Sequence, residues 1–168
     1  ILSSPTVVGG RVCFGSEDCV IYCLDAFTGS LLWNFTTGGS VRSSPAISGN
    51  NIYATSEDGR VYCLDLATGS SLWHYTTEDY PITSSPAVVN GRVYVGSYND
   101  RLYCLDAYTG SALWNYTTSA NVESSPAVAE GKVYVGSDDG QLYCLDALSG
   151  VHIWNYTTTW LQKVVSSP

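Results

Sequence analysis

The chain contains little of what several large classes of protein require. Its 168 residues include no methionine and only 7 lysines and arginines against 15 aspartates and glutamates, and charged residues make up 13%. The net charge of −8 argues against nucleic acid and anionic membranes, because a phosphate-binding surface needs the opposite field. No stretch approaches the roughly 18 consecutive apolar residues of a membrane span. Low charge combined with 13 tyrosines and 5 tryptophans also excludes a disordered chain.

The N-terminus lacks the features of an export signal. The chain begins at Ile1, with neither a basic start nor a signal-type apolar run. We therefore expect a processed product or a segment excised from a longer protein.

One sequence pattern recurs along the whole chain at a spacing of 40 or 41 residues. Ser-Ser-Pro opens each copy, and an aspartate, a glycine and a tryptophan follow at fixed offsets. These residues are Asp25, Asp65, Asp106 and Asp146; Gly29, Gly69, Gly110 and Gly150; and Trp33, Trp73, Trp114 and Trp154. We predict four repeats, over residues 1–40, 41–81, 82–121 and 122–163, and the start of a fifth at 164–168.

Each repeat has the pattern of four short strands joined by tight turns. In the third, Asn90-Gly91 favours the positive φ of a hairpin turn, and a second turn follows at residues 98–100. If Asn99-Asp100 is a two-residue turn, Val93, Val95, Leu102 and Cys104 share one face of the sheet. Tyr94, Tyr103 and Leu105 then share the other face.

A sheet that is apolar on both faces must be covered on both faces. Radial stacking of blades around an axis provides this cover, and four-stranded blades recur at this length. The sequence therefore predicts an all-β protein: a β-propeller of four-stranded antiparallel blades, with residues 1–168 forming one propeller or half-propeller unit.

The stretch from Cys23 to Trp33 resembles a known family. It is similar to the pyrroloquinoline-quinone (PQQ) type propeller repeat, whose tryptophan-docking motif runs Ala-x-Asp-x-x-x-Gly-x-x-x-Trp, and it recurs at Cys63, Cys104 and Cys144. The first motif position is Cys here in all four copies. The resemblance covers essentially the whole chain, and it extends to the propellers of the outer-membrane assembly lipoprotein and of prokaryotic surface proteins.

The motif has a physical interpretation that is independent of the family. A tryptophan on the outer strand can lie flat between blades and bury on the order of 200 Å². The glycine suits the positive φ of the turn and leaves room for the ring, while the aspartate accepts N–H groups of that turn. We predict that all twelve motif residues have structural roles.

The resemblance implies rings of seven or eight blades, so four blades would leave two apolar faces exposed. Either the chain is half of a longer propeller or two copies join in a ring. We expect a homodimer that closes an eight-bladed ring.

The family name also raises a quinone enzyme as an alternative. The resemblance to PQQ dehydrogenases would call for adjacent cysteines over the cofactor, a catalytic aspartate, a basic residue near the quinone, and oxygen ligands for Ca²⁺. The chain has no Cys-Cys pair, and near-identical repeats argue against one specialised site. We therefore predict no catalytic residues, no cofactor and no metal site.

The cysteines also have a simple interpretation. Cys23, Cys63, Cys104 and Cys144 occupy equivalent positions in different blades, too far apart for a tetrahedral metal site or for disulfides with one another. We interpret them as small core residues. Cys13 and Cys19 have no assigned role.

Three Asn-x-Thr sequons mark Asn34, Asn115 and Asn155 as candidate glycosylation sites in a secreted chain. The alternative is that duplication of one strand sequence carried the triplet along.

Acidic side chains gather at one end of the predicted blades, where the second-to-third-strand turns and the blade connections lie. This candidate acidic binding rim comprises Glu17, Asp18, Glu57, Asp58, Asp79, Tyr98, Asp100, Asp138 and Asp139, with Tyr80 and Trp160 among its loops. The alternative is a solvated rim, since Asp-Gly is itself turn chemistry.

Two functions follow as hypotheses. The first is a non-enzymatic scaffold or protein-interaction module, part of a larger protein, with an extracytoplasmic or cell-surface location. The second is a fragment of a PQQ-dependent oxidoreductase. The missing cysteine pair and the uniform repeats favour the first.

Overall fold

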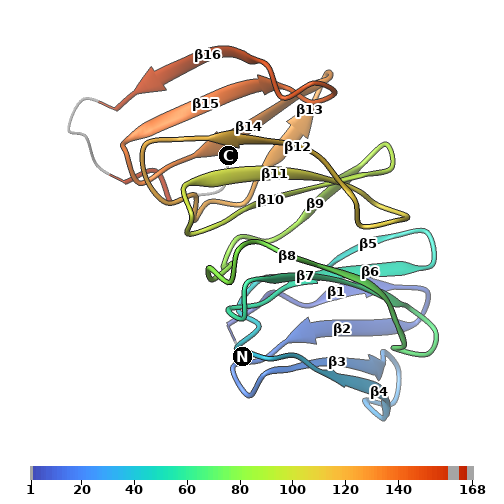
Figure 1. Ribbon diagram of the computed structural model, residues 1–168. Coiled ribbons are helices and arrows are strands. Elements are labelled where there is room, and N and C mark those ends of the chain that lie inside the picture. The colour runs from blue at the N-terminus through green and yellow to red at the C-terminus, as the bar shows by residue number, and fades with distance from the viewer. Residues whose placement is uncertain (1, 159–162, 166–168) are drawn as a thin grey trace. The chain divides into compact units, whose positions relative to one another are not determined.

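Alternating apolar residues and turn-forming pairs produce sixteen strands and no helix in the computed structural model, which describes residues 2–158 and 163–165. The strands form four antiparallel meanders, each a four-stranded sheet in sequence order. The chain divides into two compact units, Ile1–Pro86 and Ala87–Pro168, each holding two of these blades (Figure 1).

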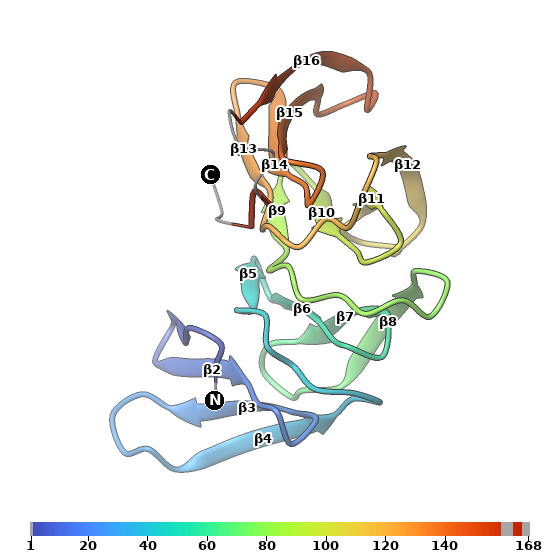
Figure 2. The ribbon, with the colours of Figure 1, turned by 90° about the vertical axis from the view of Figure 1, so that its left-hand side faces the viewer.

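The four strands of a blade differ in length and position. The first strands are β1 (Thr6–Val8), β5 (Ala46–Ser48), β9 (Ala87–Val89) and β13 (Ala127–Ala129). The second strands are β2 (Arg11–Gly15), β6 (Asn51–Thr55), β10 (Arg92–Gly96) and β14 (Lys132–Gly136). The third strands are β3 (Val20–Asp25), β7 (Arg60–Asp65), β11 (Arg101–Asp106) and β15 (Gln141–Asp146). The fourth strands are β4 (Leu31–Thr36), β8 (Ser71–Thr76), β12 (Ala112–Thr117) and β16 (His152–Thr157). Figure 2 shows β2, β3 and β4 in succession in the first blade.

The first hairpin turn forms as the sequence predicts. Asn90 and Gly91 have φ values of 51° and 72°, the paired left-handed conformation of a tight two-residue turn. The strands it joins pair in register, with Val89 opposite Arg92.

The second turn is longer than predicted, and the predicted face assignment of the third blade is wrong. Tyr94 lies opposite Cys104, and Val95 lies opposite Tyr103. Val93, Val95, Tyr103 and Leu105 therefore share one face, and Tyr94, Gly96, Leu102 and Cys104 share the other. The Ser97 N–H donates to the Arg101 carbonyl at 2.9 Å, which closes a three-residue turn in place of a two-residue one.

The physical reason for this longer turn is a left-handed residue at its end. Asp100 has φ 65°, and Gly59 and Gly140 take the same conformation at the equivalent positions. A turn of this kind adds one residue to the hairpin loop, and a shift by one residue moves side chains to the opposite face.

Both faces of the inner strands are buried, and two blades of a unit pack face to face. In the first unit, Cys23 and Trp33 lie in one core cluster with Ile52, Tyr62 and Leu64 of the next blade. The second unit repeats this arrangement between β10–β12 and β14–β15. Within each unit, the packing of one blade on the other therefore provides cover for the apolar side chains on the sheet faces between them.

Serine hydroxyls of the Ser-Ser-Pro segments attach each blade entry to the sheet. Ser43 is 1% exposed, and its Oγ donates to the Thr55 carbonyl at 2.9 Å and accepts the Thr55 N–H at 3.2 Å. The second serine links successive repeats: the Ser44 Oγ accepts the Ser4 N–H, and the Ser44 N–H donates to Ser85 Oγ. The first serine of the pair hydrogen-bonds the backbone groups at the end of the second strand. The second serine joins the entry of one blade to the entry of the next.

We predict that Ser43→Ala lowers the free energy of unfolding by about 2 kcal/mol, because it leaves buried backbone groups of Thr55 without their partner. Chemical denaturation measures the change. Ser48→Ala, at an exposed site on β5, is the control and is expected to change it by no more than about 0.5 kcal/mol. Equal effects of the two changes would contradict this role for Ser43.

Candidate functional site

The aspartate of each repeat organises the turn that follows the third strand. Asp65 Oδ1 accepts the N–H groups of Ala67 at 3.0 Å and Thr68 at 2.8 Å, and also the Thr68 hydroxyl at 2.8 Å. These hydrogen bonds from Thr68, and that from Ala67, hold the pKa of the exposed Asp65 carboxyl below its ordinary value. The same geometry and the same direction of shift occur at Asp25, Asp106 and Asp146.

The turn that Asp65 organises is the surface against which the tryptophan of the preceding blade lies. The Trp33 Nε1–H donates to the Leu66 carbonyl at 3.0 Å, and Trp33 is only 8% exposed. Gly69 has φ 73°, and a Cβ built on it would lie 2.6 Å from the Trp33 ring. Only glycine therefore fits both the turn and the ring. In the second unit Trp114 contacts Gly150 in the same way and donates to the Ala147 carbonyl at 3.3 Å.

The motif cysteine lies on the third strand, opposite the tryptophan of the same blade. Cys63 lies directly opposite Trp73, and the other three copies have the same pairing. Burial raises the pKa of the Cys63 thiol to about 11, so the group stays neutral at physiological pH. This small side chain pairs with the tryptophan just before the register shift that follows it on the third strand.

Trp154 and Gly29 make no such contact with the described residues. Trp154 is 42% exposed, and a Cβ built on Gly29 would meet no atom within 4 Å. The tryptophan of the fourth blade and the docking turn of the first are therefore open surfaces.

We predict that Trp33→Ala lowers the free energy of unfolding by about 3 kcal/mol or more, because it removes a buried ring from the contact between two blades. Trp154→Ala, at the open position, is expected to cost well under half as much in monomeric protein. Urea denaturation at low protein concentration measures both. Equal losses would show that the contact with the next blade contributes little to stability.

Some carboxylates of the predicted acidic rim form ion pairs. The guanidinium of Arg42 contacts Glu17 at 3.1 Å and Glu57 at 3.3 Å, so one cation joins carboxylates of two blades in the first unit. In the second unit Lys163 contacts Glu123 at 3.4 Å and also pairs with Asp138. Arg42 and Lys163 are therefore paired with rim carboxylates at Glu17, Glu57 and Asp138.

Other rim carboxylates stabilise their own turns. Asp58 accepts hydrogen bonds from the Gly38 N–H at 2.8 Å and from the Tyr62 hydroxyl at 2.5 Å. Asp139 does the same with the Ser119 N–H at 3.1 Å and the Tyr143 hydroxyl at 2.7 Å. Asp18 accepts the Tyr22 hydroxyl at 2.9 Å. These aspartates connect a turn to a neighbouring strand.

The remaining rim residues lie in left-handed turns. Asp79 has φ 60° and follows Glu78 at φ 55°, while Asp100 has φ 65° and follows the Tyr98-Asn99 pair. Tyr80 is 49% exposed beside Asp79. Trp160 lies outside the described residues. A binding role for the rim stays a prediction.

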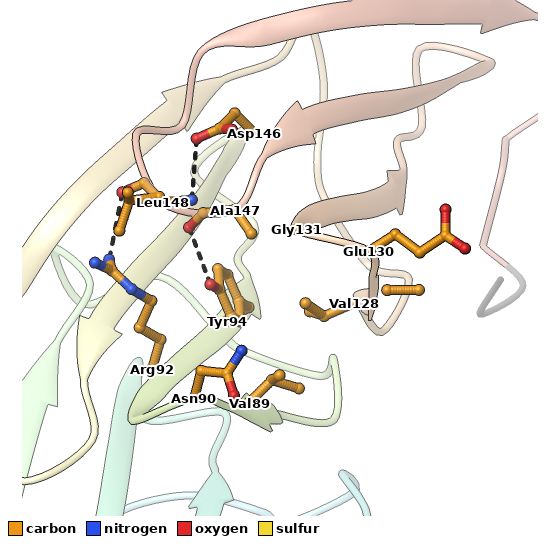
Figure 3. Close-up of a pocket in the computed structure, with 11 residues that line it drawn as sticks. Val89, Asn90, Arg92, Tyr94, Val128, Glu130, Gly131, Asp146, Ala147 and Leu148 are labelled. Carbon is orange, nitrogen blue, oxygen red and sulfur yellow. Dashed lines mark hydrogen bonds between the residues drawn. The ribbon is translucent and has the colours of Figure 1, made fainter.

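A cavity of about 530 Å³ opens between the two blades of the second unit, at the opposite end of the strands from the rim (Figure 3). Arg92 and Tyr94 reach across it from β10: the Tyr94 hydroxyl donates to the Ala147 carbonyl at 2.9 Å, and Arg92 Nη1 to the Leu148 carbonyl at 3.4 Å. Val128 and Glu130 line the other side. Sequence reasoning missed this cavity, because the residues that line it come from turns far apart in the chain.

The first unit has a smaller counterpart of about 150 Å³, lined by Arg11, Asn50, Asp65, Leu66 and Ala67. Here Cys13 occupies the position that Tyr94 has in the third blade. In the larger cavity, the Arg92 and Tyr94 side chains donate to backbone carbonyls of the neighbouring blade. That arrangement serves blade contact and provides no nucleophile paired with a base.

Asn34, Asn115 and Asn155 are exposed on the outer strands β4, β12 and β16. Among residues 2–158 and 163–165, no cluster of three histidine, cysteine or carboxylate side chains has metal-binding geometry. The same residues include no helix with the length and apolar character of a membrane span.

Four antiparallel four-stranded meanders define a β-propeller repeat protein of the PQQ-like class. The family model described as "Outer membrane protein assembly factor BamB" matches residues 1–86 and 58–168, and the chain therefore belongs to this family. No curated protein matches the chain.

Solved structures with the same fold include an outer membrane protein assembly factor and quinohemoprotein alcohol dehydrogenases. BamB from Moraxella catarrhalis is 21% identical with a TM-score of 0.83, over 99% of this chain and 54% of its own. The quinohemoprotein alcohol dehydrogenase ADHIIG from Pseudomonas putida HK5 is 21% identical with a TM-score of 0.84, over 96% of this chain and 34% of its own. The enzyme from Comamonas testosteroni is 20% identical with a TM-score of 0.81, over 92% and 34%. The chain thus spans about half of BamB and a third of the two dehydrogenases.

Proposed function

We propose that the chain is a non-enzymatic propeller scaffold that works by binding protein, including a second copy of itself. The observation that carries this proposal is the pair of unmatched docking surfaces at Trp154 and Gly29. Each has the geometry that is filled at Trp33–Gly69 and Trp114–Gly150. Membership of a family described as an assembly factor supports a binding role rather than a catalytic one.

The open surfaces are complementary in chemistry. Beside Trp154, the outer strand β16 exposes Ile153 at 44% and Tyr156 at 61%. The first blade exposes Val7 at 65% and Phe27 at 88%. Apolar area of this extent is ordinarily covered in a soluble protein. A second copy supplies both missing halves at once: Trp154 of each copy lies on the Gly29 turn of the other, and the twofold ring has eight blades.

We predict a solution mass of about twice 18.1 kDa by light scattering after size exclusion. Trp154→Ala is expected to shift the protein toward monomer, because it removes the ring that fills the docking turn. Leu148→Ala is the matched control, since Leu148 is 68% exposed but outside both open surfaces. A wild-type mass of 18.1 kDa at all concentrations would contradict self-assembly.

The acidic rim and the sequons add two further elements to the proposal. We assign the rim as the surface that binds a protein partner. Basic groups of that partner replace Arg42 or Lys163 in the ion pairs with the rim carboxylates. The exposed Asn34, Asn115 and Asn155 suit an extracytoplasmic chain, in which they are candidate glycan acceptors. The family description, which refers to the outer membrane, supports the same location.

The alternative is a fragment of a quinoprotein oxidoreductase, which the dehydrogenase neighbours favour. The residues present do not fit that cofactor: the sequence has no adjacent cysteines, and the described part of the chain gathers no oxygen-rich cluster for Ca²⁺. In the larger cavity, Arg92 and Tyr94 donate to backbone carbonyls.

We therefore expect no stoichiometric change in tryptophan fluorescence or quinone absorbance when the protein is titrated with PQQ and Ca²⁺, and no dye reduction with alcohols. A reconstituted PQQ dehydrogenase is the positive control. Saturable binding at one quinone per chain together with dye reduction would overturn the non-enzymatic assignment.

A further inference from the structure

Cys13 differs from the residue at the equivalent position on the second strand of the other three blades. At the equivalent position the other three blades carry tyrosine: Tyr53 lies opposite Cys63, Tyr94 opposite Cys104 and Tyr134 opposite Cys144. In the first blade Cys13 lies opposite Cys23. Two thiols therefore face each other in this blade alone among the four.

The strand register brings these two side chains as close as an antiparallel pair allows. The Ser16 N–H donates to the Val20 carbonyl, and the Ala26 N–H donates to the Gly10 carbonyl. Since hydrogen-bonded and non-hydrogen-bonded pairs alternate, Cys13 and Cys23 form a non-hydrogen-bonded pair between these positions. Such pairs have Cα atoms about 4.5 Å apart, within the range that a disulfide spans.

The side chains point at each other. Cys13 Sγ lies 2.8 Å from Cys23 Sγ, and both residues are 0% exposed. Trp33 lies opposite Cys23 on the same face and covers the pair from the outer strand. Both thiols are thus enclosed in the contact between the first two blades.

From this register and contact we infer that Cys13 and Cys23 form a cross-strand disulfide when the chain folds with a disulfide oxidant such as glutathione disulfide. One cysteine thiolate attacks the oxidant, which releases one glutathione thiolate and leaves a mixed disulfide on the protein. The second cysteine thiolate then attacks the protein sulfur and releases the other glutathione. Two protein thiols are oxidised, and one disulfide oxidant is reduced to two thiols.

The timing of the reaction follows from burial. Burial and the contact with Cys23 raise the pKa of the Cys13 thiol far above its ordinary value, and burial raises that of Cys23. The folded blade therefore holds the pair as unreactive thiols, and the bond forms before the second blade covers it. Once formed, the disulfide is shielded from soluble reductants.

The remaining cysteines provide internal controls. Cys63, Cys104 and Cys144 each face a tyrosine, and Cys19 lies in a turn at φ 68°. The prediction is therefore specific: one disulfide, and four of the six cysteines left as thiols.

The test is to refold the full chain with reduced and oxidised glutathione, trap free thiols in acidic denaturant, and identify linked peptides by mass spectrometry. Chymotrypsin is the suitable protease, because cleavage after Phe14 and Tyr22 separates Cys13, Cys19 and Cys23, whereas all three lie in one tryptic peptide between Arg11 and Arg42. We expect four trapped thiols and a peptide containing Cys13 joined to one containing Cys23. Six thiols, or a bond between any other pair, would overturn the inference.

Variants separate this bond from a general packing effect. Cys13→Tyr restores the residue that the other blades have at this position. The five cysteines that remain in this variant are all expected to be trapped as free thiols. Cys104→Ser is the matched control and is expected to keep the disulfide, with three thiols. The oxidised wild type is also expected to melt about 5 °C above its reduced form, because the bond constrains the unfolded chain. If peptide mapping shows the disulfide but the reductant does not change the melting temperature, the bond has no stabilising role.

Discussion

The contact of a tryptophan ring with the glycine turn of the next blade is the constraint on which the rest of the structure depends. A flat ring can approach a backbone only where no Cβ intervenes, and Gly69 and Gly150 provide that approach in the two units. The aspartate holds the turn in shape, and the motif cysteine lies opposite the tryptophan on the neighbouring strand. Together these groups form the contact through which one blade packs on the next.

The same constraint explains why the open ends matter. A blade gains burial by contact with a neighbour on each face, and nothing within one four-stranded sheet can substitute for that neighbour. Trp154 and the Gly29 turn have the shapes required for such contacts but no occupant among the residues that the structure describes. Further blades, from a second copy or from additional chain, resolve this in the same way. The choice of partner for these surfaces is therefore the central functional question for this protein.

Much of the fold could be predicted from local sequence, because its determinants are local. Asn90-Gly91 selects a tight hairpin, and strands apolar on both faces require cover on both faces. The hydrogen bonds of the Ser-Ser-Pro hydroxyls and the cavity between blades could not be predicted in this way. Both depend on backbone groups that come together from distant parts of the chain. The rim is intermediate: its acidic composition is visible in sequence, but the pairing of Arg42 with Glu17 and Glu57 exists only once two blades stack.

The sequence by itself determined the all-β class, the four repeats and the identity of the motif residues, since these follow from spacing and turn chemistry. The tertiary structure decided which residues share a face. A single left-handed residue at the second turn, Asp100 in the third blade, shifts the register by one and moves Tyr94 to the side of Cys104. In the first blade the same register places Cys13 against Cys23. Side chains alternate across a strand with period two, so a difference of one residue in a loop determines which groups can meet.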